Sequence, residues 1–185
     1  MSDFEHDKQR ELLWMPFVKD ELKKLGWTMV DAEPLKDLKE ATDLVRVENG
    51  SRVAVRTREA EEYYQKYKWE FTVRALRHTG AKTEYEKIVD DGYGDFMFYC
   101  FITNQLELMH WWFVNLNVFR QAMTEHHPID FGKTCNNHDG TYFWAFDVRR
   151  FSKRGYSILY ATHQRVAAQA IKEKRVSNYV MGRWP

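Results

Sequence analysis

The dipeptide Asn49-Gly50 is the feature that most constrains this chain, because it lies between two runs rich in β-branched residues. Asn-Gly between such runs is the strongest short-range signal for a β-hairpin, since both residues tolerate the backbone conformations of a tight turn. We therefore predict two antiparallel strands over residues 43–48 and 51–58. A two-residue turn would pair Val45 with Ala54.

The same register pairs Asp43 with Arg56. Side chains alternate between the faces of a strand, so Asp43, Arg56 and Arg58 should share one face at one end of the hairpin. In one interpretation the acid is part of a site. In the other, Asp43 is a cap or turn residue, and its pairing with Arg56 is a common cross-strand ion pair without a functional role.

Composition favours one folded domain over residues 1–185. The apolar content of 44% and the aromatic content of 16% exclude general disorder. The net charge of +1 gives no global basic field, so any anion-binding surface must be local. The two cysteines, Cys100 and Cys135, form no disulfide framework and fit a reducing cytosol. We see no secretory signal and no apolar stretch long enough to span a membrane.

The periodicity of the remaining chain predicts helices alternating with short groups of strands. Helices are expected over 8–25, 83–90, 118–124 and 165–175, and further strands over 27–30, 69–77, 95–103, 108–115, 142–149 and 157–161. Residues 34–40, 79–82 and 126–137 are expected to be a connector, a turn and a long loop. The pattern predicts an α+β fold with helices packed on a mixed sheet. No Gly-rich loop follows a strand, which argues against a P-loop or Rossmann nucleotide site.

Two carboxylates are predicted to meet at one edge of this sheet. If strands 43–48, 51–58 and 69–77 form an antiparallel meander, then the residues that begin the first and third strands, Asp43 and Glu70, lie beside Arg58. Two carboxylates can hold Mg²⁺, with a substrate phosphate completing the metal's shell. Guanidinium groups, here those of Arg56, Arg58 and Arg74, can grip the phosphate. Alternatively, Asp43–Arg56 and Glu70–Arg58 are structural ion pairs.

Residues 8–103 resemble the PD-(D/E)XK superfamily of restriction-endonuclease-like and Holliday-junction-resolvase-like proteins. The resemblance rests on a helix, a short strand, the strand that begins at Ala41-Thr42-Asp43, and the strand that follows it. The wider pattern is similar to phage-encoded members, through Glu70-Phe-Thr-Val-Arg74, Gly80-Ala-Lys-Thr-Glu84, Glu86-Lys-Ile88 and Gly94-Asp-Phe96. The resemblance implies an αβββαβ core.

By position, the resemblance makes Asp43 the motif aspartate and Glu11 the acid of the first helix. Where the family has Glu-x-Lys, this chain has Arg56-Thr57-Arg58. Arg58 takes the place of the lysine, although a guanidinium cannot act as a base. Either Glu70 supplies the missing acid, as a third metal ligand beside Asp43 and Glu11, or the site no longer cuts. Pro16 would place Glu11 before the helix if the proline occupied the first helical position.

The function expected from these residues is that of a Mg²⁺-dependent DNA endonuclease or resolvase. Asp43, Glu70 and Arg58 would be catalytic, and Arg56, Arg74 and Lys82 would bind DNA, with Lys82 also able to supply the missing lysine. The alternative is an inactive nuclease-fold protein that binds nucleic acid or a host protein, for example as an inhibitor of host defence. A phage-encoded member would act in the host cytoplasm. A homodimer is plausible, because nucleases of this superfamily often dimerise to cut two strands.

Overall fold

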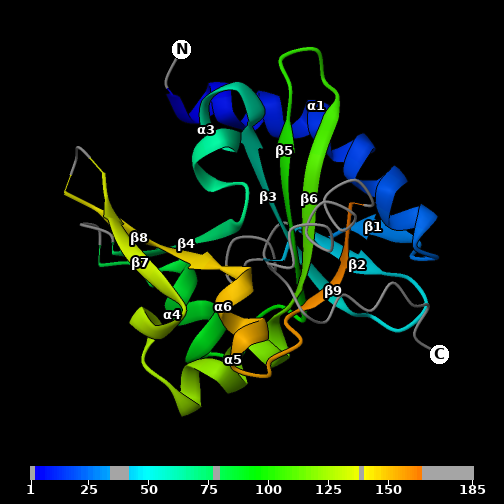
Figure 1. Ribbon diagram of the computed structural model, residues 1–185. Coiled ribbons are helices and arrows are strands. Elements are labelled where there is room, and N and C mark those ends of the chain that lie inside the picture. Colours follow the sequence, from blue (N-terminus) through cyan, green and yellow to red (C-terminus); the bar gives the residue numbers. More distant parts are fainter. Residues whose placement is uncertain (1–2, 34–41, 77–79, 138–139, 164–185) are drawn as a thin grey trace.

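The computed structural model describes residues 3–33, 42–76, 80–137 and 140–163, and the side chains of residues from 13 onward. These residues form two β-sheets with helices around them (Figure 1). The predicted α+β fold with a mixed sheet is confirmed. The predicted helix 165–175 and connector 34–40 lie outside the described residues.

The larger sheet has six strands in the order β1-β2-β3-β5-β6-β9. Their bounds are β1 Met29–Asp31, β2 Leu44–Arg46, β3 Arg52–Glu59, β5 Phe96–Ile102, β6 Leu108–Asn115 and β9 Leu159–Thr162. Strands β3 and β5 run parallel to each other, and every other neighbouring pair is antiparallel. The parallel pair brings the carboxyl ends of β3 and β5 to the same edge of the sheet.

The smaller sheet has three antiparallel strands in the order β4-β8-β7, with bounds β4 Glu70–Leu76, β8 Tyr142–Asp147 and β7 Gly132–Asn136. Helices in the described residues are α1 Asp3–Lys24, α3 Ala60–Tyr67, α4 Glu84–Val89, α5 Leu116–Glu125 and α6 Val148–Lys153, with a 3₁₀ turn η1 over Pro128–Asp130. The protein has two clusters of buried residues. Helix α1 contributes to one of them, and α3, α4, α5 and α6 contribute to the other.

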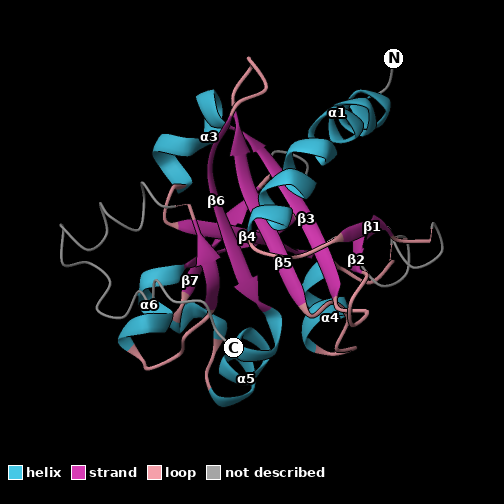
Figure 2. Cartoon of the chain, turned by 90° about the vertical axis from the view of Figure 1, so that its right-hand side faces the viewer, coloured by secondary structure: helices cyan, strands magenta, loops and turns pink. Residues whose placement is uncertain are grey.

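Helix α1 covers one face of the larger sheet (Figure 2). Its buried side chains, Trp14, Val18 and Leu22, pack with those of the sheet, among them Leu44 and Phe98. The helix runs through Pro16, so this proline does not start it and Glu11 lies within the helix. Gly26, with φ of +81°, ends it, because the Trp27 amide returns to the Leu22 carbonyl as in a Schellman motif.

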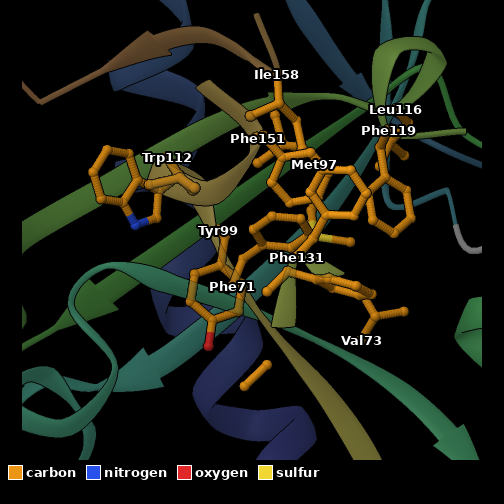
Figure 3. Close-up of a cluster of buried hydrophobic side chains, with 14 of the residues drawn as sticks. Phe71, Val73, Met97, Tyr99, Trp112, Leu116, Phe119, Phe131, Phe151 and Ile158 are labelled. Atoms are coloured by element: carbon orange, nitrogen blue, oxygen red, sulfur yellow. The ribbon is translucent and has the colours of Figure 1, made fainter. Parts of the chain in front are cut away.

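The opposite face of the larger sheet carries the main core, which it shares with the smaller sheet. Met97 and Trp112 from the larger sheet pack in one cluster with Phe71 of the smaller sheet and Phe119 of α5 (Figure 3). The Tyr99 ring lies at the margin of the labelled rings, and its hydroxyl is directed away from them. A polar group can therefore reach the seam between the sheets without entering the core.

The hairpin is present, but its predicted register is wrong. Val45 pairs with Arg52 instead of Ala54, a shift of two residues. The loop has four residues, 47–50, because the Arg46 amide donates to the Ser51 carbonyl. Within the loop, the amide of Gly50, which has φ of +73°, donates to the Arg46 carbonyl. Two-residue and four-residue loops leave the same side chains on the same face, so Asp43 still lies near Arg56.

The predicted meander is wrong at its third strand. Strand β3 is flanked by β2 and β5, whereas β4 belongs to the smaller sheet. The cause is α3, which inserts eight residues between β3 and β4 and carries the chain out of the first sheet. The carboxylates of Asp43 and Glu70 therefore do not meet at one sheet edge.

Smaller differences lie in the second half of the chain. The loop predicted over 126–137 contains η1 and β7. The strand predicted over 142–149 ends at Asp147, where the carboxylate accepts the Arg149 amide and starts α6. No helix in the described residues is both long and apolar enough to cross a membrane.

Candidate functional site

Asp43 lies immediately before β2, at the end of the β2–β3 ladder. Its main-chain amide donates to the Val53 carbonyl at 3.0 Å, and its Oδ2 accepts the Val55 amide at 2.5 Å. The carboxylate thus adds one hydrogen bond to β3 just beyond the end of the β2–β3 ladder. The side chain is 8% exposed, so a charge at this position needs a cation close by.

Arg56 supplies that cation and holds a second carboxylate as well. Its Nη1 lies 3.3 Å from Asp43 Oδ2, and its Nε donates to Glu84 Oε1 at 2.5 Å. Nη1 also donates to the Val55 carbonyl at 2.6 Å. One guanidinium therefore joins an acid on the larger sheet to an acid on α4. We call Asp43 and Glu84 the acid pair.

Glu84 is positioned by the first turn of α4. Thr83 caps this helix through a capping box, in which its Oγ1 accepts the Glu86 amide and Glu86 accepts the Thr83 amide. Glu84 follows as the first helical residue, and its side chain is 9% exposed. Its Oε2 accepts the amide of Arg74 in β4 at 3.2 Å. Glu84 thus links α4 to both sheets.

Arg58 lies two residues further along β3 and also reaches the smaller sheet. Its Nη2 donates to Thr72 Oγ1 at 3.0 Å and its Nε to the Tyr99 hydroxyl at 3.4 Å, while the two hydroxyls lie 3.2 Å apart. Burial alone would lower the pKa of Arg58, but Tyr99 and Glu84 outweigh it and raise the pKa, so the guanidinium stays charged. Within the described part of the chain, Arg58 makes no ion pair.

The charges of this cluster balance without any added ion. Two carboxylates, Asp43 and Glu84, face two guanidiniums, Arg56 and Arg58. Mg²⁺ is commonly bound through one or two carboxylates plus waters and substrate phosphate, so the acid pair is a suitable donor set once Arg56 leaves it. No group of three or more acids, histidines or cysteines in the described residues could hold a metal ion.

Glu70, the second acid expected at the site, lies elsewhere. It begins β4, opposite Asp147 of β8, and its Oε1 accepts a hydrogen bond from Lys133 at 2.9 Å. The expected Glu70–Arg58 ion pair is therefore wrong, whereas the expected Asp43–Arg56 pair is confirmed. The Glu70 Oε2 atom is buried and has no hydrogen-bond partner in the described structure.

The other residues expected at the site are spread around it. Arg74 is exposed on β4, and its main-chain amide donates to Glu84 of the acid pair. Lys82 forms an exposed ion pair with Asp91. Glu11 lies on α1, as expected, but its side chain is outside the described residues. Arg56 and Arg58 are thus the two expected basic residues that gather beside Asp43.

Sequence reasoning missed Glu84, Thr72 and Tyr99. The Thr-x-x-Glu capping signal predicted the start of α4, but a first-turn acid is an ordinary helix feature and gave no sign of burial. Thr72 and Tyr99 meet Arg58 only because β4 leaves the first sheet and packs back on it. A search for neutral hydroxyls at alternate strand positions would have found these two residues among many others.

A scan of the chain against protein families found no matching family, and a search of curated proteins found no relative.

Proposed function

We propose that this protein is a Mg²⁺-dependent nuclease of the PD-(D/E)XK type that hydrolyses phosphodiester bonds in DNA. The observation that carries the proposal is the acid pair, in which Asp43 and Glu84 converge on one guanidinium at the end of the β2–β3 ladder. In this proposal Glu84, and not Glu70, supplies the acid that the Arg56-Thr57-Arg58 segment lacks.

The order of elements supports the same family. Counted without β4 and α4, the chain runs α1, β1, β2, β3, α3 and β5, which is the αβββαβ order of the nuclease core. Strands β1, β2, β3 and β5 are also neighbours in the larger sheet. Asp43 stands where that core carries its motif aspartate.

The side chains suggest a division of work. Asp43 and Glu84 would hold Mg²⁺, which polarises a phosphoryl oxygen and lowers the pKa of a bound water. Arg56 bonds to both acids in the free protein, and its side chain is 28% exposed, so it has room to turn outward. There it would donate to the phosphate and stabilise developing negative charge. Arg58 stays in place beside Tyr99 and Thr72.

The proposal is tested by cleavage of plasmid and branched DNA in Mg²⁺ or Mn²⁺. Asp43→Asn and Glu84→Gln should both reduce cleavage to background, because each amide keeps the shape but removes a charge that the metal needs. Glu70→Gln is the matched control and should cut normally, since Glu70 lies on the smaller sheet beside Lys133. A wild-type preparation that cuts nothing, or full activity in Glu84→Gln, would refute the proposal.

A second candidate function is that of a non-catalytic nuclease-fold protein that binds DNA. It is favoured by the position of Arg56, whose guanidinium bonds to both carboxylates of the acid pair. Such a protein should shift DNA in a gel without cutting it, and its affinity should fall steeply with salt. No shift with duplex, junction or single strand at low salt would leave a host protein as the partner.

A further inference from the structure

A row of aromatic rings lies beside Arg58, where α3 meets the smaller sheet. The rings of Tyr63 and Tyr67 in α3 have centroids 6.3 Å apart, and Tyr67 lies 6.4 Å from Phe143 of β8. Tyr67 is buried in the middle, whereas Tyr63 and Phe143 are only half-buried. The two outer rings therefore keep part of their surface in contact with solvent.

Cations flank this row of rings. The Lys66 ammonium lies 5.0 Å from the centre of the Tyr67 ring, and the Lys133 ammonium lies 5.9 Å from it. Lys66 is exposed and is not among the described ion pairs, whereas Lys133 is shared with Glu70. Both ammonium groups lie beside the middle ring of the row, and the Glu62 carboxylate lies at its Tyr63 end. Rings next to ammonium groups suit a ligand that carries both flat rings and negative charge.

Arg58 joins this surface to the acid pair. Helix α3, which carries Tyr63, begins two residues after Arg58. The pKa of Tyr63 is raised by its hydrogen bond to Glu62 and by burial, and the charge of Arg58 opposes that rise. On the other side, Arg58 donates to Thr72, and Phe143 pairs across the strands with Arg74, two residues further along β4. The described hydrogen bonds of Arg58 go only to neutral hydroxyls, so a phosphate would be the first anion to accept a hydrogen bond from it among the described residues.

We propose that single-stranded nucleic acid lies across this face, with bases stacked on Tyr63 and Phe143 and a backbone phosphate on Arg58. The inference rests on the proposed nuclease function and names its substrate as a single strand or an unpaired flap. Base stacking on aromatic rings favours single strands, because the faces of bases in a duplex are already covered by their neighbours. The near-zero net charge is consistent with a local surface, since duplex binding without sequence preference depends on a wide basic field.

The test measures binding alone, with full-length protein in EDTA so that no metal-dependent cleavage takes place. A fluorescein-labelled oligothymidylate and a duplex of equal length are titrated by fluorescence anisotropy. The single strand should bind more tightly. Tyr63→Ala and Phe143→Ala should each weaken its binding at least about fivefold, which is the lower end expected for one stacked base. Phe17→Ala is the matched control, because Phe17 is an exposed ring on α1, on the other face of the larger sheet.

Arg58 is tested through the salt dependence of binding. Arg58→Gln should reduce the slope of log affinity against log salt by about one, as expected for a lost phosphate contact, whereas Arg58→Lys should keep most of the slope. A merely structural role would lower affinity without changing the slope. Unfolding curves for each variant exclude loss of the fold, and Tyr63→Phe, which keeps the ring, should bind like wild type.

The two proposals fail in different ways. If binding of the single strand depends on Tyr63 and Phe143 but no cleavage occurs in Mg²⁺, the proposed nuclease function is wrong and the proposed binding surface is supported. Equal or tighter binding of duplex, no binding of either probe, or an equal loss in Phe17→Ala would overturn the surface. Cleavage that depends on Asp43 and Glu84 could still be present in each of these cases.

Discussion

Arg56 makes the acid pair stable in the absence of a metal ion. Two carboxylates whose side chains are 8% and 9% exposed would repel each other and lose hydration without a cation between them. The guanidinium satisfies one oxygen of each, while main-chain amides of β3 and β4 satisfy Asp43 and Glu84 further. The guanidinium of Arg56 therefore both stabilises the acid pair and fills the position between the two carboxylates.

Replacing Arg56 by Met should cost about 3–5 kcal/mol of unfolding free energy at pH 8, because the variant keeps two buried carboxylates without the guanidinium that joins them. Urea unfolding of the wild type and the variant at pH 8 measures the difference.

Mg²⁺ gives this variant a second readout. If the acid pair binds metal, millimolar Mg²⁺ should recover stability in Arg56→Met at pH 8 and not in the double variant that also carries Glu84→Gln. Arg46→Met is the control, since its partner Glu48 is 42% exposed and their ion pair should contribute within about 1 kcal/mol. A loss in Arg56→Met no larger than that in Arg46→Met would contradict the assignment of buried charge.

His110 should make the protein sensitive to acid. Burial between Phe101 and Trp112 is the main cause that lowers its pKa to about 3, and the charge of His163 lowers it further, against a small opposing contribution from the Lys68 backbone. The neutral ring is therefore the folded form at all ordinary pH values. Above pH 6.5, both folded and unfolded chains carry neutral His110, and its titration does not change the free energy of unfolding.

Below pH 6.5 the unfolded chain binds a proton at His110 that the folded chain refuses, so stability should fall until the pH nears 3. The loss from this residue is bounded at about 5 kcal/mol. His110→Phe should flatten that part of the curve, because a ring of similar size replaces the titrating one. Thermal unfolding of both proteins from pH 7 to pH 4 makes the comparison, and parallel curves would show that other groups carry the acid sensitivity.

At the scale of the residue, the sequence predicted Asp43 and its neighbour Arg56, because both depend on one hairpin and side-chain alternation. It did not predict Glu84, which reaches Arg56 from a helix 28 positions away in the chain. The hydrophobic pattern of a short stretch of sequence indicates which face of a helix or strand is buried. It does not indicate which distant element covers that face. Glu70 was chosen because it begins a strand, and strand starts are equivalent only within one sheet.

Helix α4 matters as an element because its first turn sets the position of Glu84. Thr83→Ala removes the cap and should cost about 1 kcal/mol of stability, whereas Thr83→Ser keeps the hydroxyl and should cost less. If Glu84 is a metal ligand, Thr83→Ala should also reduce the cleavage rate under conditions where the variant remains folded. Unfolding by urea and cleavage rates at 25 °C, where both variants remain folded, separate the two effects.

A cleavage rate for Thr83→Ala equal to that of Thr83→Ser would show that α4 is held by packing and not by its cap. Ile88, which is buried in the main core, is the residue that would then anchor the helix. Glu86→Gln is a second control, because the amide oxygen can still accept the Thr83 amide and the charge at position 86 is not part of the acid pair.

Elements with local causes were predicted well, and pairings with distant causes were not. The stop at Gly26, the hairpin around Gly50 and the cap at Thr83 each depend on a few neighbouring residues. The parallel pairing of β3 with β5 spans more than 40 residues. The fold of residues 60–95 between these strands decides it, and no turn signal in the sequence reports that choice.

At the scale of the whole molecule, the two sheets share one core. Phe146 of β8 contacts Phe71 of β4 and Phe119 of α5, with ring centroids 5.5 and 5.0 Å apart. Met97 and Trp112 of the larger sheet belong to the same buried cluster. The seam is further joined by Arg58, which links β3 to Thr72 of β4. A site built from β2, β3 and α4 therefore depends on both sheets.

Phe146→Ala should test whether the sheets fold as one unit. The cavity left by the ring should cost about 3–5 kcal/mol of unfolding free energy. Because the core is shared, amide hydrogen exchange should accelerate in β5 of the larger sheet as much as in β8, and fluorescence and circular dichroism should report one coincident transition. Phe17→Ala, at an exposed position of α1, should leave both sheets protected. If β8 lost protection in Phe146→Ala while β5 kept it, the smaller sheet would be an independent unit, and the link between Arg58 and Thr72 would join two separately folding parts.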